Sequence, residues 1–522
     1  MTGLRSARFP LSAIDVQLYR FCEDFSQALI YFQIVFSPWA FGTTQPWSIR
    51  IMNGAGFLLG LALLLKLAVR FLKGYRPLRW DSARSIGAKT QDVSPNEALP
   101  AKAFSAPNLT SALAILTIAI LGYCLVSALN ARATYDRLTA SFVYHDHFIP
   151  WLPHSFDQAK TGSVFWNYLA LACSFWAVRD WLLGYSTGEE RALYQRADLQ
   201  RFRSVSFFPA RLRRLLWVLA INGALLGLEG IAQRLEGSGK LLFFLKPEIN
   251  VEAVSQFGPY HYRSNAAQYF NLVWPLCLGF WWTLRRAFGS KRKYYHWLLV
   301  AALIMAACPV ISTSRGGAIT SLGILLLACL SLLAAHFLFS SPQNVDQKSR
   351  KFTGVLLFLF FTGALTLGFS LGWKALEPRL GQLGEGFEGR EQMYQAARPM
   401  AVDYPWFGTG PGTFESVFGQ LYRVSTETYW PAQLHNDWLE TRITFGWIGT
   451  ALFALAFVTV LFRWFVPSGI HGGRRFVLLI WLALAGCLLQ ARFDFPFQIY
   501  SLEFLFLLTC AILFTLSRRP VP

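Results

Sequence analysis

Long apolar segments alternate with short polar segments along almost the entire chain of 522 residues. About twelve of the apolar segments approach the roughly 20 residues that a helix needs to cross a bilayer. They cover residues 25–42, 50–72, 109–129, 164–184, 214–232, 266–284, 296–312, 317–339, 353–373, 437–462, 476–491 and 497–516. Because backbone polar groups inside a bilayer must be paired within the protein, such segments form helices. The pattern therefore predicts an all-α fold, a polytopic membrane helical bundle of about 12 transmembrane helices.

Arginine and lysine residues gather in every second loop. The loops that hold most of them are 73–106, 185–213, 285–295, 340–352 and 463–475, and Arg518 and Arg519 follow the last span. Cytoplasmic loops of membrane proteins carry an excess of Lys and Arg. This asymmetry predicts a membrane protein with both termini cytoplasmic. The segment before the first span mixes Arg5, Arg8 and Arg20 with acidic residues, a poor match to a cleavable signal peptide, so we expect it to stay attached.

The composition excludes several other classes of protein. Hydrophobic residues make up 54% of the chain and charged residues 15%, against about 25% charged residues in soluble domains. A soluble fold could not bury so much apolar surface, and a disordered chain would be far more polar. The net charge of +19 comes mainly from the short loops, so it favours membrane orientation over nucleic-acid binding. None of the eight cysteines forms a CxxC motif, and we expect neither a zinc site nor a disulfide framework.

The longest loop that this orientation places outside is 374–436, which is rich in Gly, Pro, Trp and Tyr. Loops of this length tend to be functional, and we expect short helices in it that lie across the membrane surface. We divide the chain into an N-terminal region, 1–254, with spans one to five, and a catalytic region, 255–516, which includes this large helical extracytoplasmic loop.

Arg315 lies in the turn between spans seven and eight, within Ser314-Arg315-Gly316-Gly317. An arginine inside the hydrocarbon costs at least about 2.5–3.5 kcal/mol, so its side chain should face the bundle interior or water. One interpretation is a side chain that extends to the interface and anchors external phospholipid phosphates. The other is an anion clamp, because a guanidinium group matches phosphate oxygens bidentately.

A second group of candidate residues lies in the long loop. The segment 390–398 begins at Gly389-Arg390, contains Arg398, and is expected to form a short amphipathic helix that ends at Pro399. Gly408 and Gly410 mark a tight loop whose backbone could approach a ligand. The segment lacks the GK[ST] ending of a phosphate-binding loop, and a plain turn is the alternative interpretation.

His435 opens span ten in the segment His435-Asn436-Asp437. Asn436 or Asp437 is expected to cap the helix. At 3.6 residues per turn, one helix face would hold His435, Leu439, Arg442, Gly446 and Gly449. The two glycines would let a neighbouring helix pack closely and fix the orientation of His435 at the water boundary. A lone histidine at a helix start is more often a cap or surface residue, which stays the alternative.

Other candidate residues have weaker support. A metal site could use His145, His147, His154 and Asp146, but no further ligand pattern follows, and we favour a solvated loop. Arg263 precedes span six and adds positive charge outside. Arg492 and Asp494 are expected to pair with each other at a helix break.

Taken together and in this order, the motifs resemble the O-antigen ligase and polymerase family of bacterial envelope glycan transferases. His435-Asn436, nine residues and then Gly446-x-x-Gly449 resembles the ligase pattern. The turn around Arg315, and Gly389-Arg390 leading to Gly408-x-Gly410, are similar to the other markers of the family. The resemblance is clearest over about 255–500, and the N-terminal spans match only in hydropathy.

The resemblance implies an inverting, metal-independent glycosyltransferase, without a cofactor, that works at the extracytoplasmic face of the cytoplasmic (inner) membrane. The donor would be a glycan on undecaprenyl diphosphate, and the acceptor would be lipid A-core in ligases or another lipid-linked glycan in polymerases. Some relatives glycosylate proteins. In this chain, Arg315 and Arg390 would hold the donor diphosphate, and His435 would act on the acceptor hydroxyl as a base or as an orienting group. We expect substrate contacts from Arg263, Arg398, Asn436, Arg442, Gly408 and Gly410.

Two alternatives to a ligase stay open at this point. One is an O-antigen or exopolysaccharide polymerase of the same family. The other is a flippase or transporter of lipid-linked glycans, which would place charged residues along a central pathway open to both faces. The sequence favours a transferase because its polar motifs concentrate on one face.

Overall fold

The computed structural model describes residues 10–81, 106–194, 208–288, 293–337, 347–422, 432–466 and 470–518. The described chain is helical apart from two small sheets, which confirms the all-α class. An antiparallel hairpin pairs β1 (Ala133–Asp136) with β2 (Ser141–Tyr144), with Ala133 opposite Tyr144. Two-residue strands β3 (Ile470–His471) and β4 (Leu516–Ser517) pair in parallel.

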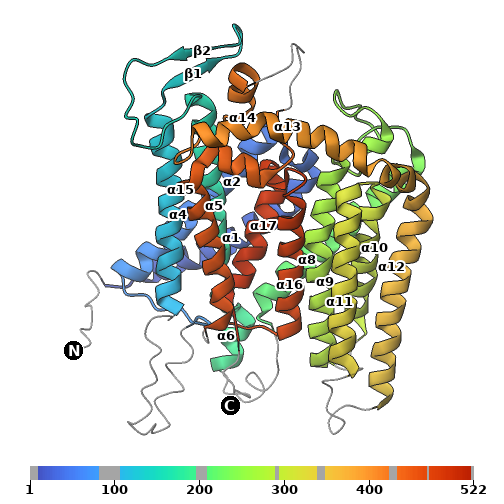
Figure 1. Cartoon of the computed structure of the whole chain (residues 1–522). Helices are drawn as coiled ribbons and strands as arrows, with labels where there is room; N and C mark the ends of the chain where they lie inside the picture. Colours follow the sequence, from blue (N-terminus) through green and yellow to red (C-terminus); the bar gives the residue numbers. More distant parts are fainter. Residues whose placement is uncertain are drawn as a thin grey trace, which may run out of the picture.

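A long helix occupies each of the positions predicted for a span. These helices are α1 (Ala13–Trp39), α2 (Pro46–Leu72), α4 (Ala106–Leu129), α5 (Gln158–Leu183), α8 (Ala210–Glu236), α9 (Arg263–Phe288), α10 (Trp297–Ile311), α11 (Arg315–Phe337), α12 (Gln347–Gly381), α15 (Asp437–Phe462), α16 (Arg474–Gln490) and α17 (Tyr500–Thr515). They run side by side between the two ends of the bundle (Figure 1). We call the end that carries the hairpin β1–β2 the outer end and the other the inner end.

Shorter helices fill the connections. They are α6 (Thr187–Tyr194), α13 (Leu383–Asp403), α14 (Phe414–Val417), the 3-10 turns η1 (Phe41–Thr43), η3 (Ala253–Ser255), η4 (Tyr294–His296), η6 (Arg463–Phe465) and η7 (Pro496–Gln498), and the π-helical turn η5 (Phe418–Tyr422).

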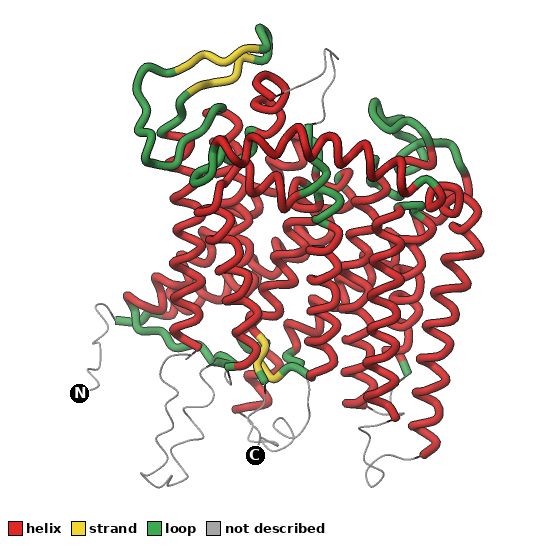
Figure 2. The backbone as a smooth tube through the Cα atoms, viewed as in Figure 1, coloured by secondary structure: helices red, strands yellow, loops and turns green. Residues whose placement is uncertain are grey.

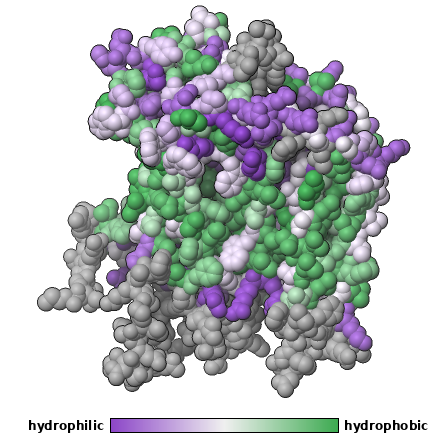
Figure 3. Space-filling model, in the orientation of Figure 1, coloured by the Kyte–Doolittle hydropathy of each residue, from purple (hydrophilic) through white to green (hydrophobic). Residues whose placement is uncertain are grey.

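The bundle is that of a membrane protein. Within the described residues, seven helices are long and apolar enough to cross a bilayer by themselves, namely α2, α4, α8, α10, α11, α12 and α15. A broad apolar band lies below a polar cap at the outer end (Figure 3). The full count of twelve crossings, the orientation and the division at residue 254 stay predictions. One buried cluster includes residues from both sides of that division, for example Leu59 and Phe280.

Helix α1 begins twelve residues earlier than its predicted span, at Ala13. Ser12 starts it with a capping box, because its side chain accepts from the Asp15 N–H (3.2 Å) and Asp15 accepts from the Ser12 N–H (2.9 Å). The added segment contains Glu23, which accepts a hydrogen bond from Lys66 on α2 (2.9 Å). Arg5 and Arg8 lie outside the described residues.

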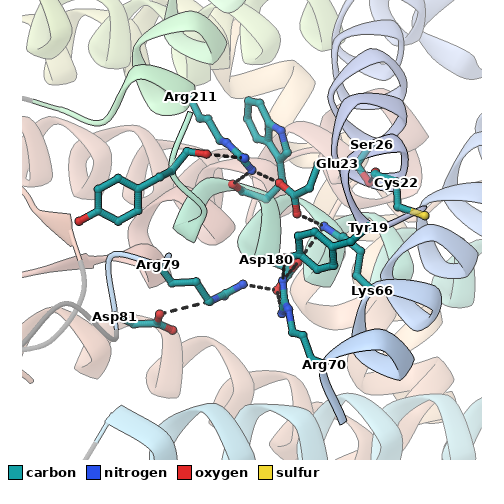
Figure 4. A network of polar contacts seen from close by, with 12 residues as sticks. Tyr19, Cys22, Glu23, Ser26, Lys66, Arg70, Arg79, Asp81, Asp180 and Arg211 are labelled. Carbon is teal, nitrogen blue, oxygen red and sulfur yellow. Dashed lines mark hydrogen bonds and ion pairs between the residues drawn. The ribbon is translucent and has the colours of Figure 1, made fainter. Parts of the chain in front are cut away.

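A network of charged side chains joins four helices at the inner end (Figure 4). Lys66, which is fully buried, bridges Glu23 (2.9 Å) and Asp180 (2.8 Å). We call this the Lys66 network, and its members are Glu23, Lys66, Arg70, Arg79, Asp180 and Arg211. It fastens α1, α2, α5 and α8 together where hydrophobic packing ends.

Helix α9 lies at the centre of the bundle and is buried on all sides from Ser264 to Arg285. It packs against α8, α10, α11 and α16. A helix buried all round lies in the interior of a fold. Its first turn therefore carries Arg263 and Ser264 into the middle of the outer end.

Helix α13 lies across the outer end of the bundle (Figures 1 and 2). The prediction of a short helix stopped by Pro399 is wrong, because α13 continues through Pro399 to Asp403. The reason is tertiary: α13 buries Tyr394, Ala397 and Met400 in a small apolar cluster, which offsets the hydrogen bond that a proline removes. Helix α12 likewise continues into the predicted loop as far as Gly381.

Candidate functional site

His435 lies at the outer end, immediately before α15. Asn436 caps that helix, as predicted, by accepting a hydrogen bond from the Leu439 N–H (3.2 Å). His435 itself has φ +56°, an uncommon backbone conformation for a non-glycine residue. The prediction that His435 shares a helix face with Leu439 and Arg442 is therefore wrong, because the cap turns the chain away from the helix at this residue.

The imidazole of His435 pairs with a carboxylate. Its Nδ1 lies 3.3 Å from Oδ1 of Asp494, in the loop between α16 and α17. The ring packs edge-on against Phe495 (4.6 Å between centroids) and lies near Tyr262. The side chain is 28% exposed, whereas that of Asp494 is only 9% exposed. A carboxylate at Nδ1 favours the tautomer in which Nε2 is free to accept a proton.

Asp494 does not pair with Arg492, which corrects the sequence prediction. The guanidinium group of Arg492 instead lies over the ring of Tyr394, 5.9 Å from its centroid. Asp494 accepts from the hydroxyl of Ser264 through its second oxygen. Both carboxylate oxygens are thus occupied, which holds the group in one orientation beside His435.

The start of α15 and the loop that carries Asp494 are fastened to each other by Asp437. Its N–H donates to the carbonyls of Ala491 (2.8 Å) and Asp494 (3.2 Å). Its carboxylate, which is buried, accepts from the Phe497 N–H (2.8 Å). Asp437 therefore fixes the relative positions of two segments about 60 residues apart.

A chain of hydroxyl groups connects this pair to the Arg315 turn. Ser264 Oγ accepts from Gln490 Nε2 (3.0 Å) and lies 3.3 Å from Ser314 Oγ. Ser314 in turn caps the first turn of α11 by accepting from the Gly317 N–H (3.2 Å). A Cβ atom on Gly317 would clash with Ala267, so this glycine lets α11 approach α9. Asp494 is thereby linked to the residue next to Arg315.

Several arginines gather beside the His435–Asp494 pair. Arg315 donates to the carbonyl of Gln382 (2.9 Å), and Arg379 donates to that of Thr313 (2.6 Å). Arg263 donates to the carbonyl of Val254 (2.6 Å), and Arg390 to that of Phe493. We call Arg263, Arg315, Arg379 and Arg390 the arginine cluster. Their partners here are carbonyl groups, so their positive charge is not neutralised by these bonds.

The electrostatic coupling of these groups shows that they share one region. Burial lowers the pKa of Arg263, and the neighbouring charges of Arg234 and Arg315 lower it further. Tyr262 lies between the arginine cluster and Asp494, because its hydroxyl interacts with Asp494, Arg390, Arg263 and Arg379. Burial is the main reason why the pKa of Tyr262 is raised.

The glycine-rich segment serves the scaffold of the site. Helix α15 breaks at Gly446 (φ +61°, ψ −167°), which frees carbonyl and N–H groups on both sides. The carbonyls of Ile443 and Thr444 accept from the N–H groups of Thr409 (2.9 Å) and Gly410 (3.0 Å). A Cβ on Gly408 would meet the Ile443 carbonyl at 2.5 Å. Gly408 and Gly410 thus contact the broken helix, and substrate contact from them stays a prediction.

Two further predicted residues contact the scaffold rather than the His435–Asp494 pair in the described structure. Arg442 donates to the carbonyls of Pro405 (2.8 Å) and Ala401 (3.4 Å), and its guanidinium lies over the ring of Trp447. Arg398 forms an ion pair with Glu391 (2.9 Å), and its side chain is 55% exposed. The roles of both in substrate binding stay predictions.

The histidines of the hairpin loop are used in local hydrogen bonds. His145 bonds to the carbonyl of Ala131 (2.8 Å) and lies 3.1 Å from the hydroxyl of Thr134. Across the residues that the structure describes, no group of three or more His, Cys, Asp or Glu side chains is placed to hold a metal ion.

Fold and site together define a polytopic membrane protein with a histidine–aspartate pair and an arginine cluster at one end of the bundle. A comparison with known families matches residues 300–454 to the O-antigen ligase family. This match supports the resemblance inferred from the motifs, and the matched region of the chain is similar to O-antigen ligases. The search of curated proteins finds no match.

The matched region contains Arg315, Arg390 and His435 but not the residues that complete the site. Arg263 and Ser264 precede it, and Asp494 follows it. Sequence analysis noted Asp494 and gave it the wrong partner, and it did not single out Ser264, Tyr262 or Arg379. An outside aspartate next to a helix break was the one available indication for Asp494. The corresponding indication for Arg379 was its position as a second arginine in the predicted long loop, upstream of Arg390.

Proposed function

We propose that this protein transfers a glycan from undecaprenyl diphosphate to a hydroxyl group of a lipid-linked or surface acceptor, as an O-antigen ligase does. The observation that carries the proposal is the pairing of His435 with Asp494 beside the arginine cluster. A base for the acceptor and a positive site for the leaving group then lie at the same end of the bundle. The reaction would occur at the extracytoplasmic face of the inner membrane.

The arginine cluster supplies what the donor requires. When the anomeric carbon–oxygen bond breaks, negative charge grows on the departing lipid diphosphate. Guanidinium groups stabilise such charge through charge-assisted, often bidentate hydrogen bonds. Because Arg315 and Arg379 bond to carbonyls, each keeps other N–H groups and its full charge for the phosphates. These arginines provide positive charge where other transferases use a metal ion, so we propose a metal-independent reaction.

His435 supplies what the acceptor requires. A sugar hydroxyl is a weak nucleophile, and a positioned imidazole accepts its proton as the oxygen attacks the anomeric carbon. In this step the new carbon–oxygen bond forms, the bond to diphosphate breaks, and the proton moves to Nε2. Asp494 stabilises the imidazolium that results. A single displacement of this kind inverts the anomeric configuration, and the released product is undecaprenyl diphosphate.

Reconstitution of the purified protein with a lipid-diphosphate-linked glycan and an acceptor tests the proposal. His435→Ala and Arg390→Ala should lower transfer by about 10²–10⁴-fold. His147→Ala, an exposed histidine in the hairpin loop, is the matched control and should retain activity. Transfer should continue in the presence of a chelator. Full activity in both site variants would remove the site from the mechanism.

Deletion of the gene distinguishes a ligase from a polymerase. The histidine motif favours a ligase, and loss of a ligase leaves unligated lipid-linked polymer in the membrane. Loss of a polymerase instead leaves single repeat units. Movement of labelled glycan between leaflets without a covalent product would favour the transporter alternative. Cysteine labelling at Asp136 and at Thr187, on opposite ends of the bundle, would establish the orientation.

A further inference from the structure

Arg179 at the inner end lies outside the Lys66 network, although Asp81 and Asp180 are close enough for their charges to act on it. The Lys66 network uses Glu23 and Asp180 to bind four cations (Figure 4). Arg179 immediately precedes Asp180 on α5. It nevertheless forms no ion pair with an acid in the described part of the chain. Arg463, at the end of α15, is close enough to interact with it as a like charge. The inner ends of α5 and α15 therefore bring two positive charges together.

The surroundings of Arg179 hold its guanidinium group in place. Nη2 donates to the hydroxyl of Thr110 at the start of α4 (2.9 Å). The group lies between the rings of Trp176 and Phe514, 5.6 Å and 5.2 Å from their centroids. Its Nε is buried and has no hydrogen-bond partner within the described residues. A buried donor of a charged group without a partner is costly.

An apolar cavity lies near this arginine. It has a volume of about 410 Å³, is lined by residues of α4, α5, α15, α16 and α17, and extends from Asp437 at the outer end toward the inner end. Four residues line its inner part, one each on α4, α5, α15 and α17, and each lies one helical turn from a residue of the Arg179 site. The pairs are Leu113 with Thr110, Phe175 with Arg179, Val460 with Arg463, and Cys510 with Phe514. Residues three or four apart share a helix face, so the cavity opens toward the guanidinium group.

We propose that Arg179 and this cavity bind an anionic phospholipid, with its phosphate on Arg179 and one acyl chain in the inner part of the cavity. A guanidinium group matches phosphate oxygens in geometry and charge. The cavity volume falls in the roughly 300–1,000 Å³ range of ligand sites, and its lining is almost entirely apolar. Basic pockets between helices are known to bind acidic lipid headgroups. The proposed lipid occupies only the inner part of the cavity, away from Asp437, and the proposal does not depend on the transfer reaction.

Native mass spectrometry of the full-length protein, titrated with phosphatidylglycerol in phosphatidylcholine nanodiscs, tests the headgroup contact. The wild-type protein should retain one phosphatidylglycerol. Arg179→Gln should weaken its binding about tenfold or more, since a hydrogen bond to a charged group is lost. Arg474→Gln, which removes an exposed arginine at the same end, is the matched control and should bind as the wild type does. Equal retention by Arg179→Gln, or an equal loss in the control, would overturn the proposal.

Two further variants keep the test decisive if Arg179→Gln does not fold. Arg179→Lys keeps the charge but not the bidentate geometry, and it should bind with intermediate affinity. Thr117→Trp fills the cavity from α4 and should displace the lipid although Arg179 is intact. Inorganic phosphate at millimolar concentration should not compete, because it has no chain. Competition by phosphate, unchanged binding in Thr117→Trp, or preference for undecaprenyl phosphate over phosphatidylglycerol would each contradict the assignment.

Discussion

In the proposed reaction, Asp494 determines what His435 can do. The carboxylate holds Nδ1 at 3.3 Å, and Ser264 and the Phe495 N–H hold the carboxylate. Such a chain leaves one ring nitrogen for the substrate and stabilises the positive charge that forms on it. We therefore propose that the pair acts as one functional unit, although its members lie 59 residues apart.

Asp494→Asn should lower the transfer rate by about 10²–10⁴-fold, because the amide keeps the shape but not the charge that supports the imidazolium. The initial rate with saturating donor measures this effect. Glu388→Gln, an exposed acid on α13, is the control for a lost negative charge at the same end and should leave the rate unchanged. A rate above half that of the wild type would show that Asp494 does not act through His435.

Arg379 is the member of the arginine cluster that the sequence did not indicate. Arg379→Gln should lower kcat/KM by roughly 10–100-fold, since a hydrogen bond to a charged group contributes about 1.5–3 kcal/mol. Lys374→Gln, an exposed cation on the same helix, provides the control and should change kcat/KM little. If both variants lose activity equally, general attraction rather than a specific contact explains the loss.

At the scale of elements, the break in α15 is the feature that holds the outer end together. The segment after α13 supplies donors and acceptors to the broken helix, and Tyr123 on α4 donates to the carbonyls of Phe407 (2.6 Å) and Phe445 (3.0 Å). Irregular backbone is tolerated at this depth when protein groups satisfy it. The break therefore positions α13, and with it Arg390.

Gly446→Ala should destabilise the protein by about 2 kcal/mol or more, because the backbone conformation strongly favours glycine and a Cβ would clash with the Trp406 carbonyl. Thermal unfolding in detergent measures the loss. Gly122→Ala is the matched control, since a Cβ there meets open space within α4 and alanine favours a helix. Comparable stability of both variants would contradict this role of Gly446.

At the scale of the whole molecule, the two ends of the bundle use charge differently. The arginine cluster at the outer end bonds to carbonyls, so its charge is available to a substrate. The Lys66 network at the inner end consists of short ion pairs between opposite charges. Paired charges bind helices to each other, whereas unneutralised charges attract anions from outside.

Lys66→Met should destabilise the protein by about 3–5 kcal/mol, because it leaves Glu23 and Asp180 with less compensation in a buried site. Chemical unfolding in detergent measures the loss. Lys73→Met is the control: Lys73 interacts with Asp15 at 3.6 Å near the surface, where an ion pair contributes about 0–1 kcal/mol. The transfer activity of the remaining folded Lys66→Met protein should be normal, and a specific loss of activity would place the network in the reaction.

The sequence by itself determined the class of the fold, the positions of the long helices and the three motifs that resemble those of the O-antigen ligase family. These are local properties, since hydropathy within about 20 residues decides whether a segment is a membrane helix. Prediction from the sequence failed where contacts with distant segments decide whether a residue lies within a helix. Pro399 does not end α13 because the apolar cluster beneath it favours the helix. Glu23 lies inside α1 because Lys66 neutralises it.

Only the tertiary structure decided which polar groups form the site. His435, Asp494 and Ser264 come from three elements separated by 59 and 230 residues, and their contact depends on how α9, α15 and α16 pack. Arg442 lies within the His435 motif, yet it donates to the carbonyl of Pro405 and not to the site. Arg379 lies in no motif, yet it joins the arginine cluster. Helix formation depends on nearby residues along the chain, whereas the direction of each side chain depends on the packing of the whole bundle.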